Sequence, residues 1–457
     1  MKKLLSLSTI IALLLMACGD DETNEVDTSP IVEEPTEEVN TDEYVDEVED
    51  EDIYNPQDTM VGSITDLEPI RLEDYDDDKW AFFDSRETGE FVESAAFEEN
   101  GRLYLGLNGD KIVALDFDST IFWEDEMAAT GFQTNFMMDE IHIYSPSMTG
   151  NQSDKNYIAA LSKETGERNY QIDLSEYGEM SEFLVDDDAL YVVLGINEDE
   201  DESYLEDNFS LHKFDKVTGE RLWEIDINGI KLGHGRAHYY VLQQNDELIF
   251  LLEKTEDDLV QIVARSKVDG TEVWTTVIGN EDDRLDGARL GRIYHSNGAI
   301  YIIDGYNMIH VFDDRTGENI AVHPFNGYQP GGMVPLPIVS EDIFIWQHGT
   351  EDYHHMKAVN PKTGEDLWVI DMAGHFLVDY GMVGDTLYAF FGSLDYDAEE
   401  STFVVRINPE TGEMMDSIQL GASISAKLNN FYVHMGLTES DDNLVYFYDN
   451  LVYLFKE

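Results

Sequence analysis

The residues whose types could support catalysis are few and scattered in this chain. The closest histidine pairs are His234 with His238 and the adjacent His354 and His355. Neither pair belongs to a zinc-binding His-Glu-x-x-His pattern. Nucleophile motifs, phosphate-binding glycine loops and dinucleotide fingerprints are also missing in a convincing context. We therefore expect these histidines to lie in loops or to pack, and we predict no catalytic residues.

Runs of acidic residues are the second group whose side chains could take part in chemistry. Asn197–Ser203 alternates oxygen-bearing side chains as a calcium loop does, but it lacks the glycine that makes the sharp turn. We interpret it as a solvated acidic insertion, and we interpret Asp186–Asp188 and Asp395–Glu400 in the same way. Weak calcium binding would fit such loops, but we predict no specific metal site.

The chain has one cysteine, Cys18, which excludes an internal disulfide and a cysteine-type zinc site. It follows a positive start, Met1-Lys2-Lys3, and an apolar run from Leu4 to Met16 that is too short for a permanent membrane span. The sequence Leu15-Met16-Ala17-Cys18 resembles the lipobox of bacterial lipoproteins, although Met16 is less usual there than a small residue. The resemblance implies that residues 1–17 are a signal peptide and that Cys18 carries the lipid anchor.

Residues 18–78 form a second zone, crowded with Asp, Glu, Thr, Val and Pro, in which Arg71 is the only basic residue. Such a composition buries too little apolar surface to offset its chain entropy. We expect a disordered acidic tether that holds the folded body away from the membrane. An acidic interaction tail is the alternative.

The charge balance is extreme, with 97 acidic and 27 basic residues and a formal net charge of −70. This charge disfavours nucleic acid as a partner, because phosphate binding needs a basic surface. Acid in nearly every loop is typical of a surface adapted to high salt. Recognition of cations or of a basic partner is the alternative.

A short phrase repeats through the sequence from about residue 79 onward. In its clearest copy, Phe214-Asp215-Lys216-Val217-Thr218-Gly219-Glu220 is followed by Arg221-Leu222-Trp223. In such a phrase Asp or Asn opens a turn and Gly takes the left-handed position that closes a hairpin. The first interval between its glycines, 77 residues, contains a degenerate copy at 113–123, and the later intervals are 47–53 residues. The glycines lie at positions 89, 166, 219, 270, 317, 364 and 412.

Short strand-like runs between the turns, such as Leu190–Leu194 and Ala299–Ile303, complete a unit of about four strands. The repeat resembles that of quinoprotein-type (PQQ-like) propellers, whose phrase ends in a Trp that packs between neighbouring blades. The resemblance implies this role for Trp123, Trp223, Trp274 and Trp368. Tyr170, Ala321 and Met415 stand at roughly equivalent places, where we expect the Trp contact to be lost.

We therefore predict an all-β fold, a single propeller of four-stranded blades over residues 79–457. The copies favour eight blades, and seven is the alternative if the degenerate copy near Ser119 is not a blade. The C-terminal segment 450–457 stops where a turn should follow, and Phe82–Phe91 supplies a turn with no preceding blade. We expect these two segments to share one blade and close the ring.

The resemblance also raises the question of a quinone cofactor. Quinoprotein dehydrogenases hold a metal beside the quinone and often carry a vicinal cysteine pair, whereas this body has no cysteine. We expect no PQQ and no other cofactor. The expected function is a non-enzymatic module that binds an envelope protein or complex, similar in architecture to the propeller lipoprotein of the outer-membrane assembly machinery. It would be monomeric and held on the extracytoplasmic face of a membrane by Cys18, in the periplasm if the cell has an outer membrane. A propeller enzyme and a cation-responsive sensor are the alternatives.

Overall fold

The computed structural model describes residues 59–74, 80–84, 92–107, 111–126, 136–147, 157–177, 180–195, 208–228, 242–255, 259–279, 293–303, 308–324, 339–340, 343–350, 353–393, 402–420, 435–440, 443–448 and 451–456. Their regular elements are strands, apart from two 3-10 turns at Ile64–Asp66 and Leu72–Asp74. The part of the chain described here contains no helix that is long and apolar enough to cross a bilayer.

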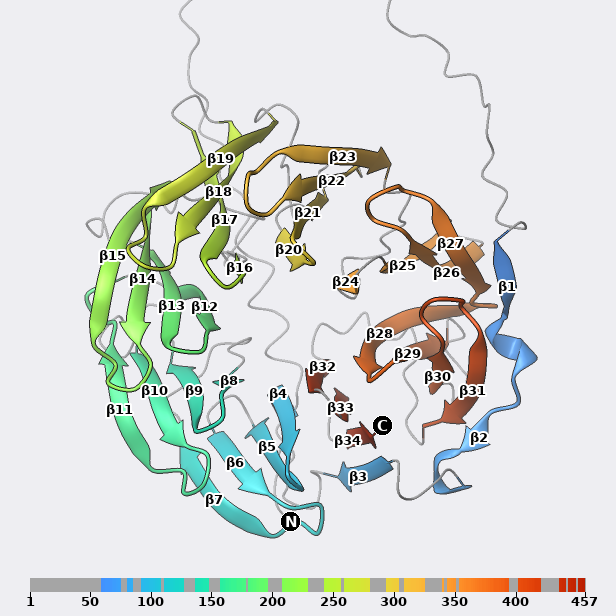
Figure 1. Ribbon diagram of the computed structural model, residues 1–457. Coiled ribbons are helices and arrows are strands. Elements are labelled where there is room, and N and C mark those ends of the chain that lie inside the picture. Colours follow the sequence, from blue (N-terminus) through green and yellow to red (C-terminus); the bar gives the residue numbers. More distant parts are fainter. Residues whose placement is uncertain are drawn as a thin grey trace, which may run out of the picture. The chain divides into compact units, whose positions relative to one another are not determined.

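The described strands form eight sheets arranged around a common centre, which confirms the predicted all-β propeller (Figure 1). We number the sheets I to VIII in chain order. Sheet I is β4 (Val92–Glu99), β5 (Arg102–Leu107), β6 (Lys111–Leu115) and β7 (Ile121–Glu126); sheet II is β8 (Met137–Met138), β9 (His142–Ser147), β10 (Tyr157–Ser162) and β11 (Arg168–Asp173); sheet III is β12 (Met180–Val185), β13 (Ala189–Gly195), β14 (Asn208–Asp215) and β15 (Arg221–Asn228); sheet IV is β16 (Gln243–Gln244), β17 (Leu248–Lys254), β18 (Val260–Ser266) and β19 (Glu272–Gly279).

The second half repeats this pattern, and three of its sheets also receive a strand from the N-terminal part of the chain. Sheet V is β20 (Ile293–Ser296), β21 (Ala299–Ile303), β22 (Met308–Asp313) and β23 (Asn319–Pro324); sheet VI is β24 (Val339–Ser340), β25 (Ile343–Thr350), β26 (Tyr353–Val359) and β27 (Asp366–Asp371), with β1 (Met60–Ser63); sheet VII is β28 (His375–Val383), β29 (Thr386–Ser393), β30 (Phe403–Ile407) and β31 (Met414–Gln419), with β2 (Ile70–Arg71); sheet VIII is β32 (Met435–Ser440), β33 (Asn443–Tyr448) and β34 (Leu451–Lys456), with β3 (Trp80–Asp84).

The hydrophobic core lies between the sheets. Each buried cluster joins two consecutive sheets, and the cluster between sheets VIII and I closes the series. The second strands of the sheets, such as β13 and β17, are nearly continuous apolar runs and are buried on both faces. In β13, for example, Leu190, Val192 and Leu194 pack toward sheet II, whereas Tyr191 and Val193 pack toward sheet IV.

The chain ends meet in sheet VIII. The antiparallel pairing of β3 with β34 runs from Trp80↔Phe455 to Asp84↔Leu451. The N- and C-terminal segments therefore share one sheet, as the sequence predicted. Such pairing removes the free strand edges that an open ring would leave.

A segment assigned to the tether from the sequence is ordered against two outer strands. Residues Thr59–Asp74, which we call the strap, contribute β1 to sheet VI and β2 to sheet VII. Ile64 is buried in the core between these two sheets, and Leu67 packs against the same cluster. The folded part of the chain therefore begins before residue 79, because a few apolar side chains in an acidic segment find a site on the propeller.

Candidate functional site

The repeated turn is held by the side chain that opens it. In sheet III, the Asp215 carboxylate accepts hydrogen bonds from the Val217 and Thr218 amides at 3.0 and 2.8 Å and from the Thr218 hydroxyl at 3.0 Å. These bonds, led by those from Thr218, lower the pKa of Asp215. Gly219 closes the turn with a φ of 73°, in the left-handed region that favours glycine. In the degenerate copy Ser119 takes this position with a φ of 65°.

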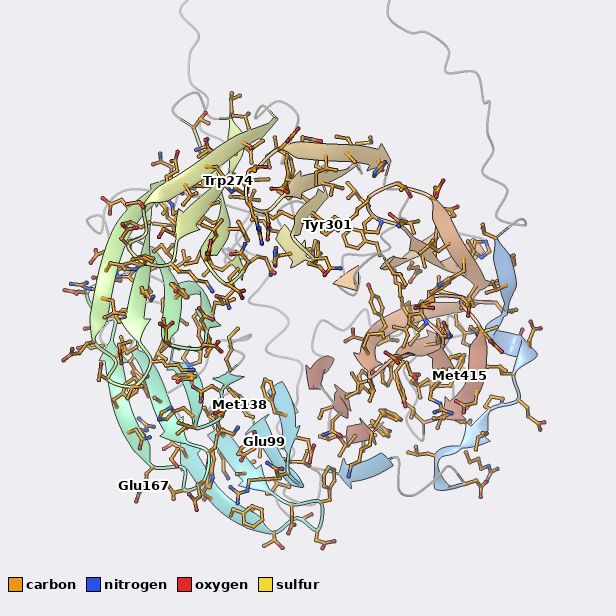
Figure 2. The ribbon with its side chains drawn as sticks, in the orientation of Figure 1. Glu99, Met138, Glu167, Trp274, Tyr301 and Met415 are labelled. Carbon is orange, nitrogen blue, oxygen red and sulfur yellow. The ribbon has the colours of Figure 1, made fainter. Side chains whose placement is uncertain are left out.

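Each turn glycine of the motif that the structure describes also receives an aromatic ring from the preceding sheet. Trp123 of sheet I lies over Gly166 of sheet II, so that a Cβ at residue 166 would come within 2.6 Å of the indole ring. The Trp123 indole Nε1 donates to the Lys163 carbonyl at 3.0 Å. Glycine is therefore required here both for its φ and for the space above it. The same contact is made by Trp223 on Gly270, Trp274 on Gly317 and Trp368 on Gly412, which agrees with the role implied for these tryptophans; Trp274 is labelled in Figure 2.

Two of the three contacts expected to be lost are instead made by other rings. Tyr170 packs on Gly219, and its hydroxyl donates to the Lys216 carbonyl at 2.6 Å. Ala321 itself cannot make the contact, but His323 lies on the same strand face and packs on Gly364. The expected loss was therefore wrong at these two turns. In sheet VII the position that pairs as the tryptophans do is Asp416, one residue after Met415, and it forms an ion pair with Arg406. Gly89, the remaining glycine of the repeat, lies outside the described residues.

Each outer strand that follows one of the described turns contains a β-bulge. The bulge turns the residue after it, which is the ring in most sheets, toward the next sheet. In β19, Ala264 pairs with Trp274 and Arg265 with Glu272, so Val273 is the extra residue and points outward. The equivalent extra residues in β7, β11, β15, β23, β27 and β31 are Phe122, Asn169, Leu222, Ile320, Leu367 and Met415.

Lysines beside three successive turns reach back to the preceding sheet. Lys163 pairs with Glu99 of sheet I. Lys216 Nζ lies 3.2 Å from Asp139 Oδ2 of sheet II, and Lys267 Nζ lies 2.7 Å from Asp186 Oδ2 of sheet III. All three lysine side chains are largely buried. These ion pairs therefore join four consecutive sheets.

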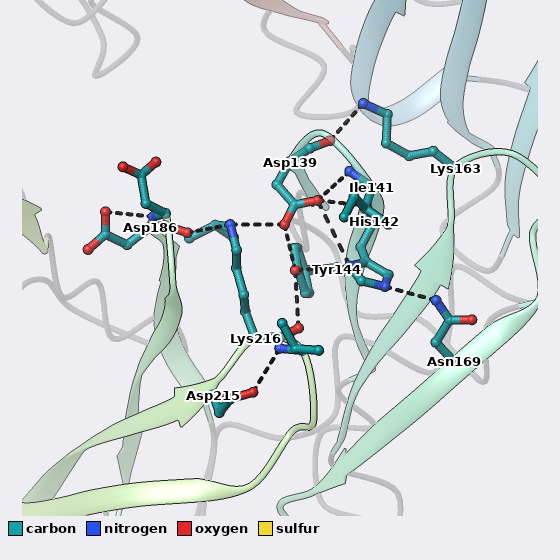
Figure 3. Close-up of polar contacts among 12 residues, drawn as sticks. Asp139, Ile141, His142, Tyr144, Lys163, Asn169, Asp186, Asp215 and Lys216 are labelled. Atoms are coloured by element: carbon teal, nitrogen blue, oxygen red, sulfur yellow. Dashed lines mark hydrogen bonds and ion pairs between the residues drawn. The ribbon is translucent and has the colours of Figure 1, made fainter.

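We call each of these polar contacts between neighbouring sheets a joint. The most connected joint surrounds Asp139 (Figure 3). Its carboxylate accepts bonds from the Ile141 and His142 amides at 2.8 and 2.7 Å and from the Tyr144 hydroxyl at 2.8 Å. Burial raises the pKa of Asp139, but these bonds and Lys216 outweigh burial and lower it overall. Burial and the neighbouring Asp139 carboxylate raise the pKa of Tyr144. The carboxylate is thus kept ionised and the phenol neutral.

The groups at this joint satisfy one another and leave no reactive pair. His142 Nε2 meets the Asn169 amide nitrogen at 2.8 Å, and its Nδ1 lies 3.4 Å from the Tyr144 hydroxyl. A nucleophile–base arrangement would need a hydroxyl or thiol at one of these nitrogens with a lowered pKa. The Tyr144 pKa is shifted in the opposite direction. The charged groups of this joint pair with each other across the two sheets and can hold the sheets together.

In the joint between sheets IV and V, the carboxylate lies on the turn of the following sheet, where the other joints have a lysine. Here Asn245 Nδ2 of sheet IV donates to Asp314 Oδ2 of sheet V at 2.9 Å. Asp314 occupies the turn position that lysine holds in sheets II, III and IV. The same oxygen accepts a 2.8 Å bond from His295 Nε2. A carboxylate thus replaces the lysine, with amide and imidazole donors facing it.

The structure places only some of the residues singled out from the sequence. Cys18, His234, His238, Asn197–Ser203 and Asp395–Glu400 lie outside the described residues. His355 lies in β26, where burial lowers its pKa and its Nδ1 has no hydrogen-bond partner in the described structure. The interpretation of Asp186 as part of a solvated insertion was wrong, because it is half-buried and pairs with Lys267.

The lysines are the site residues that the sequence analysis missed. Lys163, Lys216 and Lys267 each follow the residue that opens their turn. A signal was available, since only 27 residues of this acidic chain are basic and three of them recur at one position of the repeat.

A quinone site of the dehydrogenase type pairs the quinone with a metal. Within the described ranges, no group of three or more His, Cys, Asp or Glu side chains could hold a metal ion. The acidic and histidine side chains of the joints are committed to neighbouring sheets.

Comparisons with known proteins agree with the repeat. A family model described as outer membrane protein assembly factor BamB matches residues 74–229 and 256–432. Among solved structures, BamB from Moraxella catarrhalis is 15% identical, with a TM-score of 0.51, covering 80% of this chain and 97% of that one. The computationally designed Ika8 protein is 14% identical, with a TM-score of 0.53 and coverage of 80% and 96%. Quinohemoprotein alcohol dehydrogenase from Comamonas testosteroni is 11% identical, with a TM-score of 0.54 and coverage of 83% and 76%. No curated protein sequence matches the chain. At these identities the structural likenesses show the fold alone.

Proposed function

The chain belongs to the propeller family described as outer membrane protein assembly factor BamB, and on that premise we propose that it is a non-enzymatic binding module of the cell envelope. The proposal takes the eight sheets as the blades of one closed ring. One observation carries it: the buried charges and rings that the repeat places at its turns are used to join neighbouring sheets. A ring stabilised in this way offers rigid surfaces for a partner rather than a reactive centre.

The proposal includes a membrane anchor at Cys18. The lipobox-like sequence before this residue supports lipidation, and lipidation supports placement on the extracytoplasmic face. Cys18→Ser should move the protein from the membrane fraction to the soluble fraction, as fractionation and intact-mass measurement would show. Retention of this variant in the membrane would contradict the anchor.

The partner we propose is an envelope protein or protein complex, bound by a monomeric body. The test is crosslinking in native envelopes with the full-length lipidated protein, followed by affinity capture and mass spectrometry. Recovery of the same envelope protein in every preparation, with crosslinks on the propeller, is the expected result. Preparations that yield no reproducible partner would contradict the binding function.

We also propose that the protein takes no quinone. Dehydrogenase structures share the fold at comparable TM-scores, so this deserves a direct test. Absorbance spectra of the purified protein, with and without added PQQ and calcium, should show no bound quinone. A stoichiometric quinone spectrum that survives gel filtration would favour an enzyme.

A further inference from the structure

The strap shows how an outer strand of this propeller can be used. β1 pairs in parallel with β27 from Met60↔Val369 to Ser63↔Asp371, and the Val369 amide donates to the Thr59 carbonyl at 2.9 Å. β2 adds to β31 in the same parallel sense. The outer edge of this repeat therefore accepts an additional strand, and the chain itself covers two such edges.

The outer strands of sheets I to V, which the strap does not cover, differ in the side chains they turn outward. These lie at the bulge residue and at the two alternate positions after it. Carboxylates and proline on an edge strand oppose the addition of another strand. The outward residues are Phe122 and Glu124 in β7; Asn169, Gln171 and Asp173 in β11; Leu222, Glu224 and Asp226 in β15; Val273, Thr275 and Val277 in β19; and Ile320 and Val322 in β23, a strand that ends at Pro324.

Among these five strands, β19 is the one with no charge at the outward positions named above and no proline in the strand. Val273 and Val277 are each 52% exposed, and Thr275 between them is also exposed. These β-branched side chains favour strand pairing. β19 begins at the exposed Glu272, but its next three outward positions carry no charge, in a chain with a net charge of −70.

The inner face of β19 is fixed in place. Trp274 Nε1 donates to the Asp314 carbonyl at 3.2 Å, and Thr276 Oγ1 donates to the Gly317 carbonyl at 2.6 Å. β19 ends its sheet, and no described strand pairs with its outer side. A rigid edge with free backbone groups loses little entropy when a strand is added to it.

We propose that β19 is a docking site for an extended segment of a partner protein, which binds as an added strand of sheet IV. This inference rests on the proposed binding function and names the surface that performs it. The segment is neutral or basic, because the acidic body repels acidic chain, and it carries small or β-branched side chains opposite Val273, Thr275 and Val277. A second copy of this chain is disfavoured by the same charge.

The test places a photo-crosslinking amino acid at Val273 of the full-length protein in native envelopes. The expected result is one crosslinked partner, joined through a non-acidic segment that mass spectrometry locates. The double variant Thr275→Glu with Val277→Asp gives β19 the outward carboxylates of β15. It should lower the yield of this crosslink at least tenfold.

The matched control adds two carboxylates away from the edge. Val217→Glu with Val268→Glu changes two turn residues that are 71% and 84% exposed, and it should leave the yield within twofold. Thermal unfolding of both double variants checks that the propeller remains folded. Equal loss in both would assign the effect to charge and overturn the edge site.

The outcomes also separate this inference from the proposed function. A partner captured by lysine crosslinking, with no crosslink from Val273, would leave the binding function standing and overturn the β19 site. Crosslinks from Val273 to a second copy would replace the partner with self-association, which also overturns the proposal. Failure of both captures would reject the binding function itself.

Discussion

At the scale of single residues, the buried His212 should make the stability of the propeller depend on pH. His212 in β14 has no exposed surface, and its Nε2 lies 2.7 Å from the Ser210 hydroxyl. Burial, aided by the positive charge of Arg221, lowers its pKa to about 4. The unfolded chain binds this proton near pH 6.5, whereas the folded protein binds it only near pH 4. The free energy of unfolding should therefore fall as pH drops through this window.

The variant His212→Gln should reduce that pH dependence. The wild-type loss from this group is at most about 3 kcal/mol between pH 6.5 and pH 4. Urea unfolding at a series of pH values measures it. His310→Gln is the matched control, because His310 stands at the same repeat position and stacks on Phe312 as His212 stacks on Phe214, but is only partly buried. An unchanged slope in His212→Gln would contradict this account.

The joint at Asp139 predicts a large cost for removing its cation. Lys216→Met should lower the free energy of unfolding by about 2–3 kcal/mol, because it leaves a largely buried carboxylate without its partner. Adding Asp139→Asn should recover part of this loss, since an amide carries no charge. Lys111→Met removes an ion pair to the half-exposed Glu124 and should cost within about 1 kcal/mol. Equal costs for the two lysines, measured by urea unfolding, would show that burial of the joint does not matter.

At the scale of elements, the strap is a peripheral piece added to the outer strands of sheets VI and VII. Its two strands are short, and Ile64 is its buried anchor. Ile64→Asp should release the strap without unfolding the propeller, because the charge cannot remain in the core between sheets VI and VII. Arg71 is the only basic residue between Lys3 and Lys79, so trypsin reports on this segment.

Cleavage after Arg71 should accelerate at least tenfold in Ile64→Asp. Thr65→Asp adds the same charge at the neighbouring exposed residue and should change the rate little. If both variants are cleaved as slowly as the wild type, the strap is held by something other than Ile64. If the thermal transition of the propeller is lost along with strap protection, the strap is part of the global fold rather than a separate element.

At the scale of the whole molecule, self-repulsion should govern stability. A net charge of −70 disfavours the compact state, and salt screens it, with the Debye length falling from about 10 Å at 0.1 M to about 3 Å at 1 M. The melting temperature should therefore rise with NaCl over this range. A flat or falling melting temperature in calorimetry would contradict the salt-adapted interpretation. Calcium at matched ionic strength should add nothing further, and an additional rise would favour the cation-responsive alternative.

The sequence alone determined the repeat, the turns, the propeller and the meeting of the chain ends. These features are encoded locally: Asp215 and Gly219 form their turn within five residues, and the apolar runs between turns mark strands buried on both faces. The match of four tryptophans to the repeat also predicted their contacts with the next sheet. The acidic composition of residues 18–78, averaged over the segment, hid the few apolar residues that anchor the strap.

Only the tertiary structure decided which side chains meet across the sheets. Lys267 and Asp186 are 81 residues apart, and their pairing depends on how two sheets stack, which no local pattern specifies. The replacement of a tryptophan by His323, two residues beyond the expected position, follows from the pleat that gives both positions the same face. The difference between covered, acidic and open outer edges likewise appears only when the eight sheets are compared in place, because edge status is a property of the assembled ring rather than of any one strand.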